Sequence, residues 1–252
     1  MTGLVIAIDG PSGVGKSTVS REVARRLGLA YLDTGATYRV TALACMREGV
    51  PFANEADVVA MAETMNVELV LDPDNPLVLL DGEEVSVLLR SEAVTGAVSA
   101  VSTNLEARAS LGRWQRELIA REAKGGRSEG RGIVAEGRDI TTVIAPDADV
   151  RVLMTADPEV RVARRAAEGG HSLASTAGGA AGHEAGGAAG HEAGVHGSIA
   201  QIRAGVLGRD AKDSTVVNFT TAADGVVTLD TTDLTIDEAV AAIVALAREA
   251  RP

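Results

Sequence analysis

The stretch GPSGVGKS, residues 10–17, follows the apolar run LVIAID and leads into STVSREVARRL, residues 17–27, whose apolar residues have helical spacing. Its glycines, lysine and serine match the pattern G-x-x-x-x-G-K-[ST], which is informative only between a strand and a helix. Both are expected here. The stretch therefore predicts a phosphate-binding loop that opens an α/β fold, in preference to an ordinary glycine turn.

The residue types of this loop suit a polyphosphate. Glycines let backbone N–H groups turn inward, and the helix that follows presents its unpaired N-terminal donors. The Lys16 ammonium would reach the outer phosphates, and the Ser17 hydroxyl would bind Mg²⁺ together with the phosphates. The predicted nucleotide-binding residues are Gly10, Pro11, Ser12, Gly13, Val14, Gly15, Lys16, Ser17 and Thr18.

Length and composition favour one α/β unit. The 252 residues suit a single domain with a smaller lobe. With 46% hydrophobic and 2% aromatic residues, the core must consist of Val, Leu, Ile and Ala, as in parallel strands covered by helices. The formal net charge of −11 argues against nucleic acid as a partner. An anionic ligand must therefore meet a local positive pocket.

The single cysteine, Cys45, excludes a disulfide framework within the chain and is expected to be a small buried hydrophobic residue. The first residues lack a basic segment followed by an apolar run and a cleavage site, and no run reaches the ~18 apolar residues of a membrane span. We expect a cytoplasmic protein that has no membrane partner.

Short runs rich in Val, Ile and Leu alternate with longer segments of helical spacing, which indicates βαβ units and a five-stranded parallel sheet covered by helices. Strands are predicted at residues 4–9, 30–33, 132–136, 149–154 and 226–230. Helices are predicted at residues 16–27, 36–48, 105–124, 158–168 and 236–248. Residues 67–86 break this rhythm, because their turns follow too closely for crossover helices, and predict a small antiparallel insert. Residues 125–131 are expected to form an exposed connection.

Residues 169–197 are of low complexity, and AGGAAGHE occurs twice in tandem at 177–184 and 185–192. All four histidines lie here, which makes a metal site one hypothesis: His171, His183, His191 and His196. A flexible insertion is favoured instead. A Gly/Ala chain would lose much conformational entropy on closing around an ion, and no cysteine supports the site.

Arginines follow the ends of two predicted strands, in LDTGATYR (residues 32–39) and EGRDI (residues 136–140). Ligands bind at these ends in open α/β sheets, so Arg39 and Arg138 are expected to face the same crevice as Lys16, although surface arginines are an alternative. PEVRVARR places three more on one helix face, where a solvated face is the alternative. The predicted catalytic residues are Lys16, Arg138, Arg161, Arg164 and Arg165.

Two groups of cations around one crevice suggest two phosphorylated substrates and transfer of a phosphoryl group between them. A mobile arm that bears arginines should then exclude water. The sequence contains no N-K-x-D motif, which disfavours a GTPase, and shows no strand ending in an acidic pair of the kind that ATP-driven machines need. A kinase for another small acceptor and a nucleotide-binding switch are the remaining alternatives.

Four stretches resemble bacterial-type cytidylate kinases, in a likeness that covers nearly the whole chain apart from about residues 169–197. They are AIDGPSGVGKSTVSREVARRLGLAYLDTGATYR, LDGEEVSVLLRSEAVTGAVS, EGRDITTVIAPDADVRVLMTADPEVRVARR and GRDAKDS. The resemblance implies a P-loop nucleoside monophosphate kinase. Separately, we expect a monomer. Its core would comprise about residues 1–35, 101–156 and 212–252, its monophosphate-binding part 36–100 and its lid 157–211.

The resemblance also implies the reaction, ATP-dependent phosphorylation of CMP and dCMP with Mg²⁺ by direct in-line transfer in pyrimidine nucleotide salvage. Carried over by position, Ser99, Arg108 and Asp139 would read the cytosine, Arg39 and Arg138 would hold the CMP phosphate, Tyr38, Arg209 and Asp213 would lie near the sugar, and Thr34 would line the same pocket. A carboxylate, an arginine and a hydroxyl complement the donors and acceptors of cytosine.

Two features depart from this family. Val216 stands where an arginine is common, so one phosphate or sugar contact is expected to be missing or replaced, with Lys212 as one candidate replacement. The Gly/Ala/His insertion lengthens the lid. We expect it to affect lid closure little.

Overall fold

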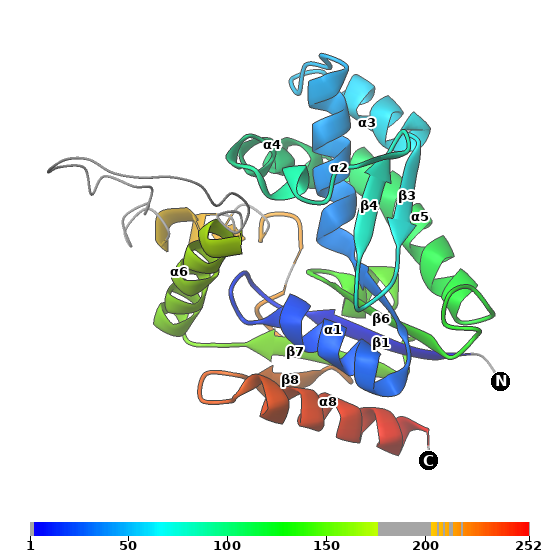
Figure 1. Ribbon diagram of the computed structural model, residues 1–252, viewed down its shortest axis with the longest axis vertical. Coiled ribbons are helices and arrows are strands. Elements are labelled where there is room, and N and C mark those ends of the chain that lie inside the picture. The colour runs from blue at the N-terminus through cyan, green and yellow to red at the C-terminus, as the bar shows by residue number, and fades with distance from the viewer. Residues whose placement is uncertain are drawn as a thin grey trace, which may run out of the picture.

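The computed structural model describes residues 3–175, 203–205, 207–208, 210–211, 214–217 and 219–251, with the backbone alone over 168–175. At its centre lies a five-stranded sheet in which all neighbouring strands are parallel, in the order β2-β6-β1-β7-β8 (Figure 1). The strands are β1 (Leu4–Asp9), β2 (Ala30–Asp33), β6 (Gly132–Gly137), β7 (Val150–Thr155) and β8 (Val227–Asp230). The predicted parallel sheet is confirmed, with strand ends that differ by at most one residue.

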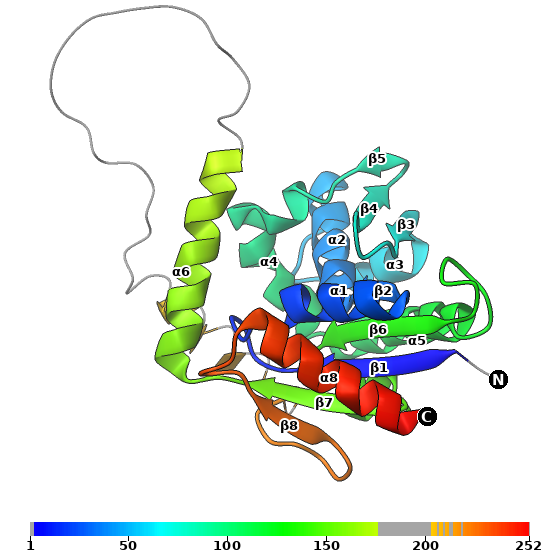
Figure 2. The same cartoon turned by 60° about the horizontal axis from the view of Figure 1, so that its bottom comes forward.

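Alternation along β1 divides its side chains between two apolar layers, because successive residues of a strand point to opposite faces. Ile6 and Ile8 pack with α1 (Lys16–Leu27) and α8 (Ile236–Ala250), whereas Ala7 packs with α5 (Leu105–Glu122) on the other face. Figure 2 shows α1 and α8 side by side along the sheet. Helices thus cover both faces, as the apolar composition of the strands predicts.

A second apolar cluster lies above the carboxyl end of β2 and contains Cys45, which is buried as expected. It is built by α2 (Thr34–Arg47), α3 (Glu55–Thr64), α4 (Glu92–Ser102) and a three-stranded antiparallel sheet of β3 (Val67–Val70), β4 (Leu77–Leu80) and β5 (Glu83–Glu84). The short 3-10 helix η1 (Leu88–Arg90) joins this sheet to α4. The predicted antiparallel insert is confirmed, but α3 and α4 were not predicted.

Helix α6 (Pro158–Ser175) leaves the sheet after β7 (Figure 2). It begins at the predicted residue, Pro158, and the Asp157 carboxylate before it accepts a hydrogen bond from Glu159 N at 2.8 Å. The helix continues beyond the predicted end at residue 168, into the low-complexity segment. Most of that segment, residues 176–197, lies outside the described residues.

A π-helix, η2 (Ile140–Ile144), follows β6 at the edge of the sheet where the strands end. The buried Asp9 carboxylate at the end of β1 accepts hydrogen bonds from the backbone N–H groups of Ile140 and Thr141, both at 2.8 Å. Asp9 therefore fixes the segment after β6 against the end of β1. Over the described residues, no helix is both long enough and apolar enough to cross a membrane.

Candidate active site

The loop between β1 and α1 has the backbone that its glycines predict. Gly13 and Gly15 have φ values of 83° and 90°, in the left-handed region that favours glycine. A Cβ on Gly13 would lie 2.7 Å from the carbonyl oxygen of Arg161. Helix α1 has no side-chain cap and no acidic residue in its first turn, so its N-terminal N–H groups are available to an anion.

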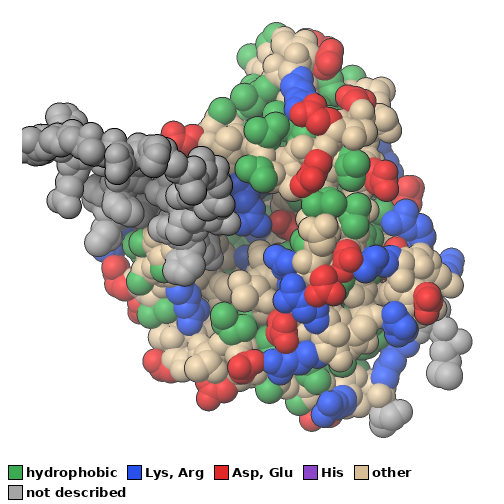
Figure 3. All heavy atoms as spheres, viewed as in Figure 1, with side chains coloured by type: hydrophobic (Ala, Val, Ile, Leu, Met, Phe, Trp, Pro, Cys, Tyr) green, Lys and Arg blue, Asp and Glu red, His purple; other side chains and the backbone are tan. Residues whose placement is uncertain are grey.

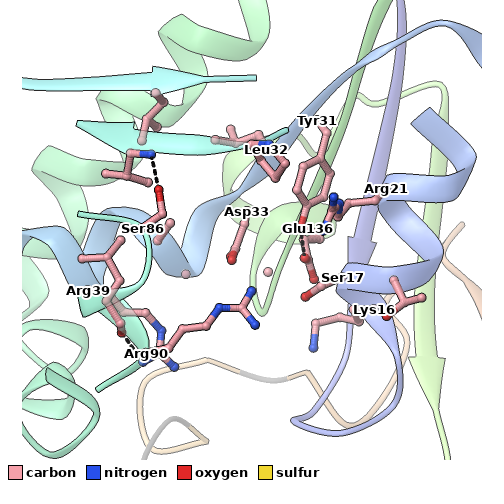
Figure 4. A pocket seen from close by; sticks show the side chains of 18 of the residues that line it. Lys16, Ser17, Arg21, Tyr31, Leu32, Asp33, Arg39, Ser86, Arg90 and Glu136 are labelled. Carbon is pink, nitrogen blue, oxygen red and sulfur yellow. Dashed lines mark hydrogen bonds between the residues drawn. The ribbon is translucent and has the colours of Figure 1, made fainter. Parts of the chain in front are cut away.

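Lys16 lies at the start of α1 and lines a cavity of about 1190 Å³, here termed the cleft. Its Nζ donates a hydrogen bond to the carbonyl oxygen of Pro11 at 2.9 Å. Burial lowers the pKa of Lys16, and the nearby Glu136 carboxylate opposes that shift. In Figure 4, Lys16 and Ser17 lie on one side of the cleft, and Arg39 and Arg90 lie on the other. The ammonium is thus fixed at the wall of the cleft, where it is partly shielded from solvent.

Several arginines line the same cleft as Lys16. The predicted residues Arg39, Arg138 and Arg165 all line it. Arg39 donates to the carbonyl oxygen of Leu89 and to Thr95 Oγ1, both at 3.2 Å. Burial lowers the pKa of Arg39; Asp33 opposes that shift, and the neighbouring arginines add to it. Figure 3 shows Lys and Arg side chains around the hollow of this face, so an acidic chain has a locally positive cleft, as predicted.

An acidic residue that was not assigned to the site lies beside the loop. Glu136, at the end of β6, lines the cleft and accepts hydrogen bonds from the Tyr31 hydroxyl, at 2.6 Å, and from the Ser17 side chain. Burial raises the pKa of Glu136 to about 7, the Asp33 charge adds to the rise, and Lys16 opposes it. A strand next to β1 that ends in a single acidic residue was the available sequence signal.

The three predicted arginines of α6 have different surroundings. Arg161 Nη1 donates to the carbonyl oxygen of Ser12 at 3.1 Å, and Arg164 Nη1 donates to that of Val14 at 3.4 Å. Arg164 also donates to the carbonyl oxygen of Thr231 at 2.7 Å. Arg165 is the member of this trio that lines the cleft. Two of the arginines thus contact the loop backbone, and the third faces the cleft.

Three of the residues assigned to cytosine and sugar contact one another but do not line the cleft: Tyr38, Arg108 and Asp139. The Arg108 guanidinium pairs with the Asp139 carboxylate, and it lies 5.5 Å from the centre of the Tyr38 ring. Burial raises the pKa of Asp139, and Arg108 opposes the rise. The Thr34 hydroxyl donates to the carbonyl oxygen of Glu136 at 2.8 Å, which links this group to β6.

The other predicted residues either do not line the cleft or lie outside the described residues. Ser99 lies half-buried on α4 and does not line the cleft. Val216 is half-buried. Outside the described residues lie Arg209, Lys212, Asp213, His183, His191 and His196, and only the backbone of His171 is described. Over the described residues, no three His, Cys, Asp or Glu side chains group as a metal site would require.

A second cavity, of about 540 Å³, adjoins the cleft at Gly15 and Thr18. Its wall is mostly apolar and comes from the loop, α1 and the start of α8: Val14, Val19, Leu234, Ile236 and Ala239. Arg164 and Thr231 are among the polar residues that also line it. The loop between β1 and α1 therefore separates two spaces, one rich in arginine and one largely apolar.

Sequence comparisons with known proteins match the chain to one family. The family model for cytidylate kinase matches residues 6–177. The chain is 40% identical to the cytidylate kinase of Cutibacterium acnes over 96% of this chain and 95% of that protein. It is 40% identical to the enzyme of Nocardia farcinica over 95% and 91% of the two chains, and 37% identical to that of Streptomyces avermitilis over 98% and 94%.

Proposed function

Because the chain belongs to the cytidylate kinase family, we propose that it transfers the terminal phosphoryl group of ATP directly to the phosphate of CMP or dCMP. The products are ADP and CDP or dCDP, as in pyrimidine nucleotide salvage. The observation that carries the proposal is that Lys16, Arg39 and Arg138 line one cleft. A site that only binds ATP needs no cations on the acceptor side.

The donor binds at the loop, with its phosphates against the N-terminus of α1 and Lys16. Its base enters the apolar cavity, because this cavity opens from the loop at Gly15 and Thr18 and its walls suit an uncharged ring. The donor then spans from the apolar cavity into the cleft. Its terminal phosphate points toward the arginines.

The acceptor binds in the cleft from the opposite side. Its phosphate pairs with Arg39 and Arg138, since planar guanidinium groups bind phosphate oxygens in pairs. The cytosine lies against Arg108, Asp139 and Ser99, and the sugar near Tyr38, Arg209 and Asp213. Thr34 lines the same pocket. This arrangement brings the two phosphates end to end at Lys16, the geometry that in-line transfer requires.

Mg²⁺ fits the oxygen donors beside the loop. This ion prefers hydroxyl, carboxylate and phosphate oxygens and keeps several waters. Ser17 would hold it together with the ATP phosphates, with the carboxylates of Asp33 and Glu136 on the same wall of the cleft. When bound, the ion would neutralise charge on the transferring phosphoryl group.

The side chains of this protein have three tasks in the transfer. Lys16, Arg138 and Arg165 face the reacting phosphates and stabilise the charge that develops on them. Arg161 and Arg164 hold the loop through its carbonyl groups and complete the cation set when α6 approaches the donor. Closure of the arm that contains α6, residues 157–211, excludes water that would otherwise hydrolyse ATP. The remainder divides into a monophosphate-binding part, residues 36–100, and the core.

One assay tests the proposal. ADP release is measured with ATP, Mg²⁺ and each of CMP, dCMP, UMP, AMP, GMP and dTMP. We expect CMP and dCMP to be the best acceptors, and absence of turnover with both rejects the proposal.

A variant pair separates a kinase from a nucleotide switch. Arg138→Ala should lose transfer to CMP and keep ATP binding, whereas a switch would be indifferent to this change. Arg113→Ala is the matched control, because Arg113 is an exposed arginine that pairs with Glu63.

A further inference from the structure

The guanidinium of Arg138 is held by two residues of one C-terminal segment, residues 210–219. Arg138 Nη2 lies 3.1 Å from Asp210 Oδ1, and its central carbon lies 4.6 Å from the centre of the Phe219 ring. The carboxylate contacts an N–H edge of the guanidinium, and the ring contacts its face. Two different contacts therefore fix the direction of the one arginine.

Phe219 is almost completely buried where it contacts Arg138. Its side chain is 1% exposed, whereas the Arg138 side chain is 22% exposed because it lines the cleft. The chain has two phenylalanines and is 2% aromatic, so an aromatic ring is not its usual core residue. A ring beneath a guanidinium attracts the charge and restricts the tilt of its plane.

Asp210 connects Arg138 to the donor side. Its other carboxylate oxygen, Oδ2, lies 2.5 Å from Arg161 Nη1, and Oδ1 accepts a hydrogen bond from Ser12 N at 3.2 Å. Asp210 is 8% exposed, so solvent screens these contacts little. A single carboxylate thus joins the phosphate-binding loop, helix α6 and Arg138.

We propose that Phe219 and Asp210 are positioning residues that orient Arg138 for the phosphate of the acceptor nucleotide, and that Asp210 also couples Arg138 to the donor loop. The inference rests on the proposed function, since that function supplies the acceptor nucleotide whose phosphate Arg138 binds. A guanidinium whose plane is already fixed binds phosphate with little further loss of conformational freedom. Phe219 contributes to the acceptor side alone, and Asp210 to both sides.

The contact with the ring is tested by the binding of CMP in the absence of ATP. Phe219→Leu keeps an apolar side chain and removes the aromatic face, and Phe219→Tyr keeps the face. Phe52→Leu is the matched control, because Phe52 packs in the second apolar cluster. We expect Phe219→Leu to raise the Kd for CMP about 5- to 30-fold, with Phe219→Tyr and Phe52→Leu within about twofold of the unmodified chain and the Kd for ATP unchanged in all three. Calorimetry reports Kd separately from the bound fraction, so partial unfolding of a variant does not imitate the shift.

Asp210→Asn tests the coupling. The amide keeps an acceptor for Ser12 N but loses the charge that pairs with Arg138 and Arg161. We expect the Kd values for CMP and for ATP both to rise, unlike the effect of Phe219→Leu. If the Kd rises for neither nucleotide, the proposed coupling is wrong.

The two hypotheses fail in different ways. CMP that binds without being phosphorylated rejects the proposed function and leaves the positioning of Arg138 standing. Equal Kd values for CMP in the unmodified chain and Phe219→Leu, or equal rises for CMP and ATP in Phe219→Leu, overturn the inference while turnover of CMP continues.

Discussion

Arg108 on α5 and Asp139 after β6 form an ion pair that is nearly closed to solvent, with 13% and 9% of their side chains exposed. A second hydrogen bond, from Arg108 Nη1 to the carbonyl oxygen of Ser102 at 3.0 Å, ties the guanidinium to the end of α4. Two consecutive helices, α4 and α5, thus hold an arginine beside a carboxylate that follows β6. In the proposed function this pair reads the cytosine.

Asp139→Asn should weaken the binding of the acceptor nucleotide, CMP, and leave the binding of the donor, ATP, unchanged. A hydrogen bond to a charged group contributes about 1.5–3 kcal/mol, so we expect the KM for CMP to rise about 10- to 100-fold and the KM for ATP to stay the same. Steady-state kinetics with each nucleotide varied in turn measures both. Asp147→Asn, at an exposed aspartate of the same region, is the control. Equal KM values for CMP in the two variants would remove Asp139 from the acceptor site.

Lys16→Ala should reduce kcat about 10²- to 10³-fold or more, because it removes a charge contact that strengthens in the transition state. The Lys16 ammonium lines the cleft and donates a hydrogen bond to the carbonyl oxygen of Pro11 in the loop, which holds its charge in place. The kcat is measured from ADP release at saturating CMP. Lys124→Ala, at an exposed lysine, should turn over like the unmodified chain. Near-normal turnover of Lys16→Ala would exclude the mechanism.

The sheet and the loop could be predicted from the sequence because their signals are local. Apolar runs bounded by glycine and aspartate define β1 and β2, and the helix that follows Gly15 has regular apolar spacing. Helix α3 also had a local signal, since Asn54 caps it by accepting a hydrogen bond from Asp57 N at 3.5 Å. Helix α4 contains Gly96 and several β-branched residues, which have low helix propensity. Its packing against α2 in the second apolar cluster decides its structure.

The positions of Arg39 and Arg138 in one cleft could be predicted, because both follow carboxyl ends of parallel strands. The partners of Arg138 could not. Asp210 and Phe219 are far from it in sequence, and nothing local indicates which segment will cover the end of β6. The elevated pKa of Glu136 likewise depends on burial beside Asp33, a neighbour that only the strand order provides.

Deletion of residues 177–192, the two AGGAAGHE repeats, should leave turnover of CMP within a few-fold of that of the full chain. These repeats contain none of the residues assigned to either nucleotide. A Gly/Ala chain gives closure little enthalpy, and shortening a loop changes its closure free energy only slowly with length. The kcat and both KM values of the deletion variant check this. A collapse of kcat would show that the repeats act in closure.

The pH dependence of stability should change in Glu136→Gln. Folding raises the pKa of Glu136 from 4.5 to about 7, so between these values the folded chain binds more protons than the unfolded chain, and its free energy of unfolding falls as pH rises. Each pKa unit corresponds to about 1.4 kcal/mol, which gives a loss of about 3 kcal/mol from pH 4 to pH 8. Glu136→Gln should lack this part of the loss. Urea unfolding at a series of pH values, without nucleotide or metal, measures it, with Glu68→Gln, at an exposed glutamate, as the control. Parallel pH profiles for the unmodified chain and Glu136→Gln would contradict the buried, proton-binding state of this carboxylate.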